Sequence, residues 1–175
     1  MLAASAFFLL LASPAARPAP AADPWTPVRF LIGDWTGESE GEPGKGAATR
    51  SYQFVLKDRF IHERNVSTYP PQPKNEKGEV HEHWSFLSYD RARHTIVLRQ
   101  FHPEGFVNQY ALRPGGAPGA LVFESEALEN VPAGWKARET YRVVSPDEFV
   151  ETFEIASDGS TFSVYSRTRF RRARR

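Results

Sequence analysis

The feature that most constrains this chain is a succession of about ten short segments with β-strand character, spaced roughly 8–14 residues apart. Turn-forming sequences separate them, for example at residues 57–59, 90–93 and 145–147, and no helical period longer than one turn interrupts them. Sequential strands joined by short turns form a meander, and a meander of this many strands protects its edges by closing on itself. The sequence therefore predicts an all-β fold, an up-and-down antiparallel β-barrel of about ten strands.

The strand boundaries follow from the turns. After a first strand near residues 33–41, the predicted strands are 51–56, 60–68, 81–89, 95–102, 106–113, 121–128, 135–144, 148–156 and 161–172. The one long connection, 69–78, carries three prolines, and we expect it to border the mouth of the barrel. Trp25, in the linker before the first strand, is expected to plug one end.

The N-terminal region predicts a leader. Residues 3–12 form an apolar run that is too short to span a bilayer as a mature helix. The small residues of 19–21 match what a signal peptidase reads, so we place cleavage after Ala21. The predicted organisation is a signal peptide at 1–21 and one β-barrel domain at 22–175. We expect a periplasmic or secreted protein with no integral membrane segment after cleavage.

Charge and cysteine content exclude several classes of function. Arg17 is the only charged residue of the leader, so its loss leaves 21 of the 22 Lys and Arg residues against 21 Asp and Glu. A chain this close to neutral has no overall field that favours nucleic acid, and we expect no nucleic-acid partner. The absence of cysteine excludes disulfides, thiolate metal sites and thiol nucleophiles.

Alternation along the strands assigns most apolar side chains to the interior, together with several polar ones. In the last strand, Val164, Ser166 and Phe170 are expected inside and Tyr165 outside. The polar residues that share a phase with inward apolar neighbours are Arg99, Asn108, Glu139 and Glu151. Two interpretations stay open: internal salt bridges of Arg64 or Arg99 with Glu139 or Glu151, or a wet cavity lined for a ligand.

Histidines are the other candidates for chemistry. His81 and His83 are two residues apart on a predicted strand, so both imidazoles point to one face, a spacing that zinc-binding strands use. His62 or His102 could supply a third ligand from a neighbouring strand. The sequence marks no clear third ligand, and we assign no metal site.

Two segments carry a family resemblance. Gly33, Trp35, Gly37 and Gly41 in the first strand match the opening motif of the nitrobindin-like proteins, haem-binding β-barrels related to lipocalins and fatty-acid-binding proteins, while Ser39 replaces a usual glycine. The strand segment 81–86, His-Glu-His-Trp-Ser-Phe, is similar to the family's histidine-bearing strand. The resemblance places His81 on the distal side of a haem. It also implies a proximal histidine near the C-terminus, and this chain has none after His102.

We expect a lipocalin-like barrel that binds a small, mostly apolar ligand in its interior. The alternatives are a haem protein acting on nitrogen oxides or peroxynitrite, with an isomerase-like activity only if haem is bound, and a non-binding interaction module. No nucleophile elbow or nucleotide fingerprint points to an enzyme, so we assign no catalytic residue. The candidate ligand-binding residues are Trp35, His62, Arg64, His81, His83, Arg99, Tyr110, Glu139 and Tyr141.

Overall fold

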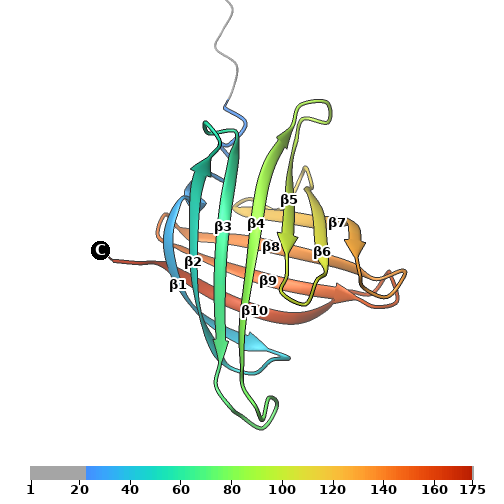
Figure 1. Ribbon diagram of the computed structural model, residues 1–175. Coiled ribbons are helices and arrows are strands. Elements are labelled where there is room, and N and C mark those ends of the chain that lie inside the picture. The colour runs from blue at the N-terminus through green and yellow to red at the C-terminus, as the bar shows by residue number, and fades with distance from the viewer. Residues whose placement is uncertain (1–22, 175) are drawn as a thin grey trace, which may run out of the picture.

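The computed structural model describes residues 23–174, in which ten antiparallel strands close into a barrel (Figure 1). The strands are β1 (Gly33–Gly41), β2 (Gly46–Val55), β3 (Phe60–Tyr69), β4 (Glu79–Asp90), β5 (Thr95–Phe101), β6 (Val107–Leu112), β7 (Ala120–Glu129), β8 (Lys136–Ser145), β9 (Glu148–Ala156) and β10 (Ser163–Arg172). Each strand pairs with its neighbours in sequence, and β1 also pairs with β10. The predicted up-and-down β-barrel is confirmed. The leader predicted at residues 1–21 lies outside the described residues.

Glycines allow β10 to lie close against β1. A Cβ at Gly37 would lie 2.8 Å from side-chain atoms of Phe170 and Thr168, which is closer than real Cβ contacts come. A Cβ at Gly41 would lie 2.2 Å from the carbonyl oxygen of Tyr165, and its φ of +153° is one that other residues rarely adopt. The first strand therefore bends and meets the last one only because these positions have no side chain.

One end of the barrel is closed by aromatic and aliphatic side chains. Trp25 is buried there with Val28 and Leu31 from the segment around the 3₁₀ turn η1 (Arg29–Leu31), as the sequence predicts. Trp35 lies across them: its indole nitrogen donates to the carbonyl of Leu31 at 2.6 Å, and its ring meets Phe149 edge-on with centroids 4.8 Å apart. This end is therefore filled by buried side chains of the hydrophobic core.

The other end is the mouth. Because hairpin connections alternate between the two ends of a meander, the β1–β2, β3–β4, β5–β6, β7–β8 and β9–β10 connections all lie at this end (Figure 1). The β3–β4 connection is the long proline-bearing one. Gln72 within it holds the β1–β2 turn, accepting from the amide of Lys45 and donating to the same residue's carbonyl.

The inward faces follow the predicted alternation in most strands, with exceptions in β5, described with the site below, and in β10. A β-bulge between Val164 and Ser166 inserts Tyr165 as an extra residue opposite β9. Val164 consequently lies outside the cavity, while Tyr165, still 39% exposed, borders the cavity and packs edge-on against Phe153. The expectation that Val164 points inward and Tyr165 outward was wrong, because a bulge reverses the alternation on one side of it.

Candidate functional site

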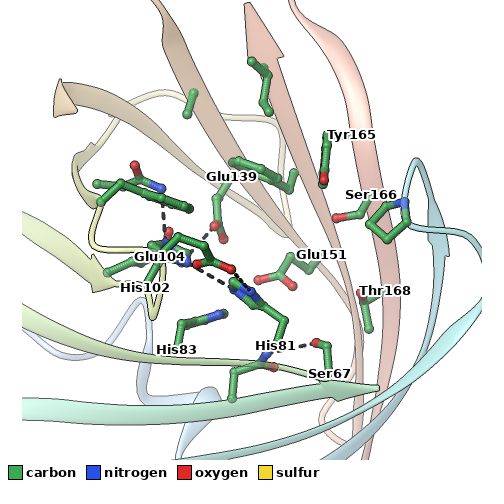
Figure 2. A pocket seen from close by; sticks show the side chains of 18 of the residues that line it. Ser67, His81, His83, His102, Glu104, Glu139, Glu151, Tyr165, Ser166 and Thr168 are labelled. Atoms are coloured by element: carbon green, nitrogen blue, oxygen red, sulfur yellow. Dashed lines mark hydrogen bonds and ion pairs between the residues drawn. The ribbon is translucent and has the colours of Figure 1, made fainter. Parts of the chain in front are cut away.

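A cavity of about 490 Å³ occupies the mouth half of the barrel. Its outer wall is mainly apolar, formed by residues at or beside the mouth ends of their strands: Phe106, Leu128, Val131, Trp135, Phe153 and Ile155. Polar side chains from every strand except β1 and β7 line the rest of it, and Figure 2 shows several of them converging. The cavity therefore has an apolar wall and a polar floor.

Arg50 is the centre of that floor. Its guanidinium donates in a two-pronged contact to Glu151, from Nη1 at 2.6 Å and Nη2 at 2.9 Å, and its Nε lies 3.0 Å from Glu63 Oε1. The guanidinium also lies 4.3 Å over the ring of Phe170. Planar guanidinium groups suit such paired carboxylate contacts better than any other cation in proteins. The ion cluster thus fixes three strands, β2, β3 and β9, around one point.

Glu63, within this cluster, and Glu139, beside it, have opposite pKa shifts. Burial alone would raise the pKa of Glu63, but Arg50 and His83 outweigh it and lower this pKa to about 2. Burial and the neighbouring Glu151 raise the pKa of Glu139 well above its ordinary value. Glu139 has no guanidinium contact, and accepts instead from Gln100 at 2.8 Å and from the Tyr141 hydroxyl at 2.9 Å. One guanidinium cannot balance three buried carboxylates, so Glu139 is the one that holds its proton most tightly.

Three histidines meet on the cavity wall beside this floor (Figure 2). His81 and His83 come from β4, and His102 follows β5 directly, one position beyond the Trp84–Phe101 pair of the β4–β5 register. His81 Nε2 lies 3.2 Å from His102 Nδ1, and one ligand atom from each of the three rings lies within 4.8 Å of the others. Burial and the two neighbouring imidazoles lower the pKa of His102 to about 3, so it is neutral at physiological pH.

The predicted site residues divide into three groups. His81, His83 and Glu139 line the cavity. Trp35, Tyr110 and Tyr141 are buried in the core, and the Tyr141 hydroxyl donates to the cavity residue Glu139.

His62, Arg64 and Arg99 lie on the outer face, which overturns their expected inward orientation. Arg64 bonds to Glu82, Arg99 bonds to Gln109 and Ser88, and His62 packs against the rings of Trp84 and Phe86. The expected salt bridges of Arg64 or Arg99 with Glu139 or Glu151 are therefore wrong.

Arg50 and Glu63 are the functional residues that sequence reasoning missed. Both were readable from alternation, since Arg50 shares a phase with Ala48 and Tyr52, and Glu63 with Ile61. The predicted second strand began at residue 51, whereas β2 begins at Gly46, and this boundary error left Arg50 in a loop. The sequence left two interpretations of the inward polar residues open, internal salt bridges or a cavity. The interior holds both, an ion cluster around Arg50 and a cavity beside it.

The cavity residues do not fit the haem that the family resemblance implies. β10, at the C-terminal end of the chain, presents Tyr165, Ser166 and Thr168 to the cavity and no histidine. A tyrosine ligates ferric haem as the phenolate, but burial raises the pKa of Tyr165 and so disfavours that form. All three histidines of the cavity lie together on one wall.

The fold and the cavity define a class: a closed ten-stranded antiparallel β-barrel whose interior is compatible with holding a small molecule. Among solved structures, the barrel is similar to the crystal structure of Rv2717c from M. tuberculosis, with a TM-score of 0.65 at 14% sequence identity over 87% of this chain and 99% of that one. A de novo designed fluorescence-activating β-barrel, with a TM-score of 0.43 at 16% identity, covers 83% of this chain and 95% of its own. The likeness to Rv2717c is one of fold alone. The likeness to the designed barrel is too distant to support any argument.

Sequence comparison adds no family to this likeness of fold. No protein-family model matches the chain. No curated protein matches it either. Nitrobindin-like membership therefore stays a prediction. Among residues 23–174, no helix has the length and apolar character needed to cross a membrane.

Proposed function

We propose that this barrel binds a small, mostly apolar ligand in its interior. The observation that carries the proposal is the cavity itself, whose volume of about 490 Å³ falls within the range of about 300–1,000 Å³ that small-molecule sites occupy. An apolar wall with a few convergent polar groups is the usual composition of such sites. A non-binding interaction module would have an interior filled by side chains, and the cavity argues against that alternative.

The charges of the floor favour an uncharged ligand. Arg50 is already neutralised by Glu63 and Glu151, and these three groups together carry one excess negative charge. An anionic headgroup would find no uncompensated cation at the floor, and would face the excess negative charge at short range. Lys136 also lines the cavity, but at the mouth end of β8 and away from the floor. The ligand expected is therefore neutral, with one hydrogen-bonding end at the floor and an apolar body along Phe153 and Ile155.

Native mass spectrometry of the chain after mild purification tests whether it carries such a molecule. Nile red serves as a neutral fluorescent probe, with lauryl alcohol and lauric acid as competitors of matched length and different charge. In the chelator-treated chain, we expect Nile red to bind and the alcohol to displace it more strongly than the acid. A chain that binds neither the probe nor any co-purified molecule would overturn the proposal.

A pair of tryptophan substitutions locates the binding. Ile155→Trp fills the cavity from its apolar wall, whereas Val144→Trp adds the same ring at an exposed position of β8. Ile155→Trp is expected to weaken Nile red binding by about tenfold or more, a loss of about 1.4 kcal/mol, and Val144→Trp to leave it unchanged. Loss of binding with Val144→Trp alone would place the dye on the outer surface.

The location outside the cytoplasm is proposed from the predicted leader. An alanine-rich apolar segment at 3–12 followed by small residues supports export to the periplasm or medium. N-terminal sequencing of the chain recovered from the expressing cells is expected to begin near residue 22. Recovery of the intact N-terminus from the cytoplasm would contradict export.

A further inference from the structure

We propose that His81, His83 and His102 form a binding site for a divalent transition-metal ion such as Zn²⁺, set in the wall of the cavity. The first observation is the convergence of the three rings. Ring centroids of the three pairs are 5.1–5.8 Å apart, and the ligand atoms all lie within 4.8 Å of one another. Three imidazoles from two adjacent strand ends are the donor set of open zinc sites, in which a fourth position is left for water or another ligand.

The spacing of the inner nitrogens matches shared ligation. Two nitrogens bound to one tetrahedral zinc at about 2.0–2.1 Å lie roughly 3.4 Å from each other. His81 Nε2 and His102 Nδ1 are 3.2 Å apart. A short movement of the side chains would therefore bring both onto one ion.

Each ring has its outer nitrogen held by another side chain. Glu104 Oε1 lies 3.2 Å from His81 Nδ1 and Glu63 Oε1 lies 3.3 Å from His83 Nε2, and both carboxylates can accept from these rings. Asn108 Nδ2 lies 3.3 Å from His102 Nε2, and a half-turn of this amide would present its oxygen as the acceptor that a metal-bound His102 needs. Metal-bound histidines nearly always have such a partner, because it fixes the tautomer and the orientation of the ring. The partners occupy one nitrogen of each ring and leave the other nitrogen of each ring for the ion.

The nitrogen left over on His83 supports the same assignment. His83 is 8% exposed, and its Nδ1 has no hydrogen-bond partner among the described residues. A buried acceptor without a partner costs free energy that a bound cation would recover. Network histidines without an ion would leave this nitrogen unsatisfied.

The site is distinct from the apolar ligand proposed above and does not depend on it. His81, His83 and His102 all line the cavity, so the open coordination position faces the same interior. The donor set of imidazoles without thiolates suits Zn²⁺, Cu²⁺ or Ni²⁺ rather than Ca²⁺ or Mg²⁺, which prefer oxygen ligands.

Titration of the chelator-treated chain tests the site, using protein without a histidine tag. Calorimetry with Zn²⁺ is expected to give one ion per chain, and Co²⁺ is expected to give the visible absorption of a tetrahedral complex. Zn²⁺ is also expected to raise the melting temperature, since an ion that binds the folded chain stabilises it by mass action. Absence of binding by the folded wild-type chain would overturn the proposal.

The five histidines provide matched variants. His83→Gln and His102→Gln remove a ligand and are expected to weaken Zn²⁺ binding more than about 100-fold, beyond the 10–100-fold typical of losing an outer partner. His62→Gln on the outer face and His94→Gln in the β4–β5 turn are expected to leave affinity unchanged. Circular dichroism checks that each variant folds.

A second pair of variants keeps the test valid if His83→Gln or His102→Gln unfolds the chain. His81→Gln changes a partly exposed ligand at the rim, and Glu104→Gln changes only its exposed partner. We expect a loss of more than about 100-fold for the first and about 10-fold for the second. Binding that survives His81→Gln, or that disappears with His94→Gln, would mean a different site and would overturn the assignment.

Discussion

The two halves of this barrel are built on opposite principles. At the plugged end, Trp35, Phe149 and Phe170 pack ring against ring, and Arg172 lies over the Trp35 ring while donating to backbone carbonyls. At the mouth end, Arg50, four carboxyl groups and three histidines line an open space, and Glu63 contacts Arg50 from behind it. The same alternation of strands thus yields a core that stabilises the fold at one end and a polar site at the other, where such groups tend to cost stability.

Removal of the indole at the plugged end should give the largest effect. Trp35→Ala leaves a cavity among Leu31 and Phe149 and removes the bond to the Leu31 carbonyl, so we expect a loss of about 3–5 kcal/mol in the free energy of unfolding, measured by urea denaturation. Trp84→Ala on the exposed outer face is the control, with less than about 1 kcal/mol expected. Equal losses for both would mean that the plug is not the main source of stability.

Removal of the cation at the mouth end should cost somewhat less. Arg50→Met leaves Glu63 and Glu151 without their partner, and we expect a loss of about 3 kcal/mol, at the low end for broken buried ion pairs because the cavity admits water. The triple variant with Glu63→Gln and Glu151→Gln removes the stranded charges as well. It should recover much of that loss, and a triple variant no more stable than Arg50→Met would contradict this account.

Glu139 gives a pH-dependent difference between the halves. Because its folded pKa is raised, the folded chain keeps this proton at pH values where the unfolded chain has lost it, so stability falls as pH rises above the ordinary carboxyl range. The slope from this one group is at most about 1.4 kcal/mol per pH unit. Melting temperatures from pH 5 to pH 9 should fall less steeply for Glu139→Gln than for the wild type. Parallel curves would show that Glu139 is ionised in the folded chain.

Outer-surface ion pairs should give the smallest effect. Arg169 contacts Glu148 on the exposed side of β10, and Arg171 shares the same carboxylate. Arg169→Gln is expected to change the free energy of unfolding by less than about 1 kcal/mol, and less still at high salt. A larger loss would mean that the ion pairs of Arg169 and Arg171 with Glu148 contribute substantially to stability.

Most of the fold could be predicted from the sequence, because turns and polar–apolar alternation are patterns of residues close together in the chain. The meander, the plug at Trp25 and the inward phase of Asn108, Glu139 and Glu151 all follow from residues near one another in the chain. The predicted inward orientation of Arg99 was wrong because the preceding residues Ile96, Val97 and Leu98 are all apolar and all buried. Such a run has no polar–apolar alternation that would indicate which side of the strand Arg99 faces.

The site itself depends on distant pairing. His102 meets His81 and His83 only through the β4–β5 register, and Arg50 meets Glu151 across 101 residues of chain. Alternation identifies which side of a strand a residue faces, but not which strand lies opposite it across the barrel. The bulge at Tyr165 shows the same limit, since one inserted residue changes the face without any mark in the residue types.

The pairing of β1 with β10 has a consequence for how the molecule reaches its folded state. Residues 35–41 pair with 166–172, so the ring cannot be completed until the final strand has left the ribosome. A partly synthesised chain has two open edges, and contacts this remote in sequence form slowly because a long loop must close first. Truncation within the last ten residues should therefore affect the whole molecule, since it would reopen both ends of the sheet at once.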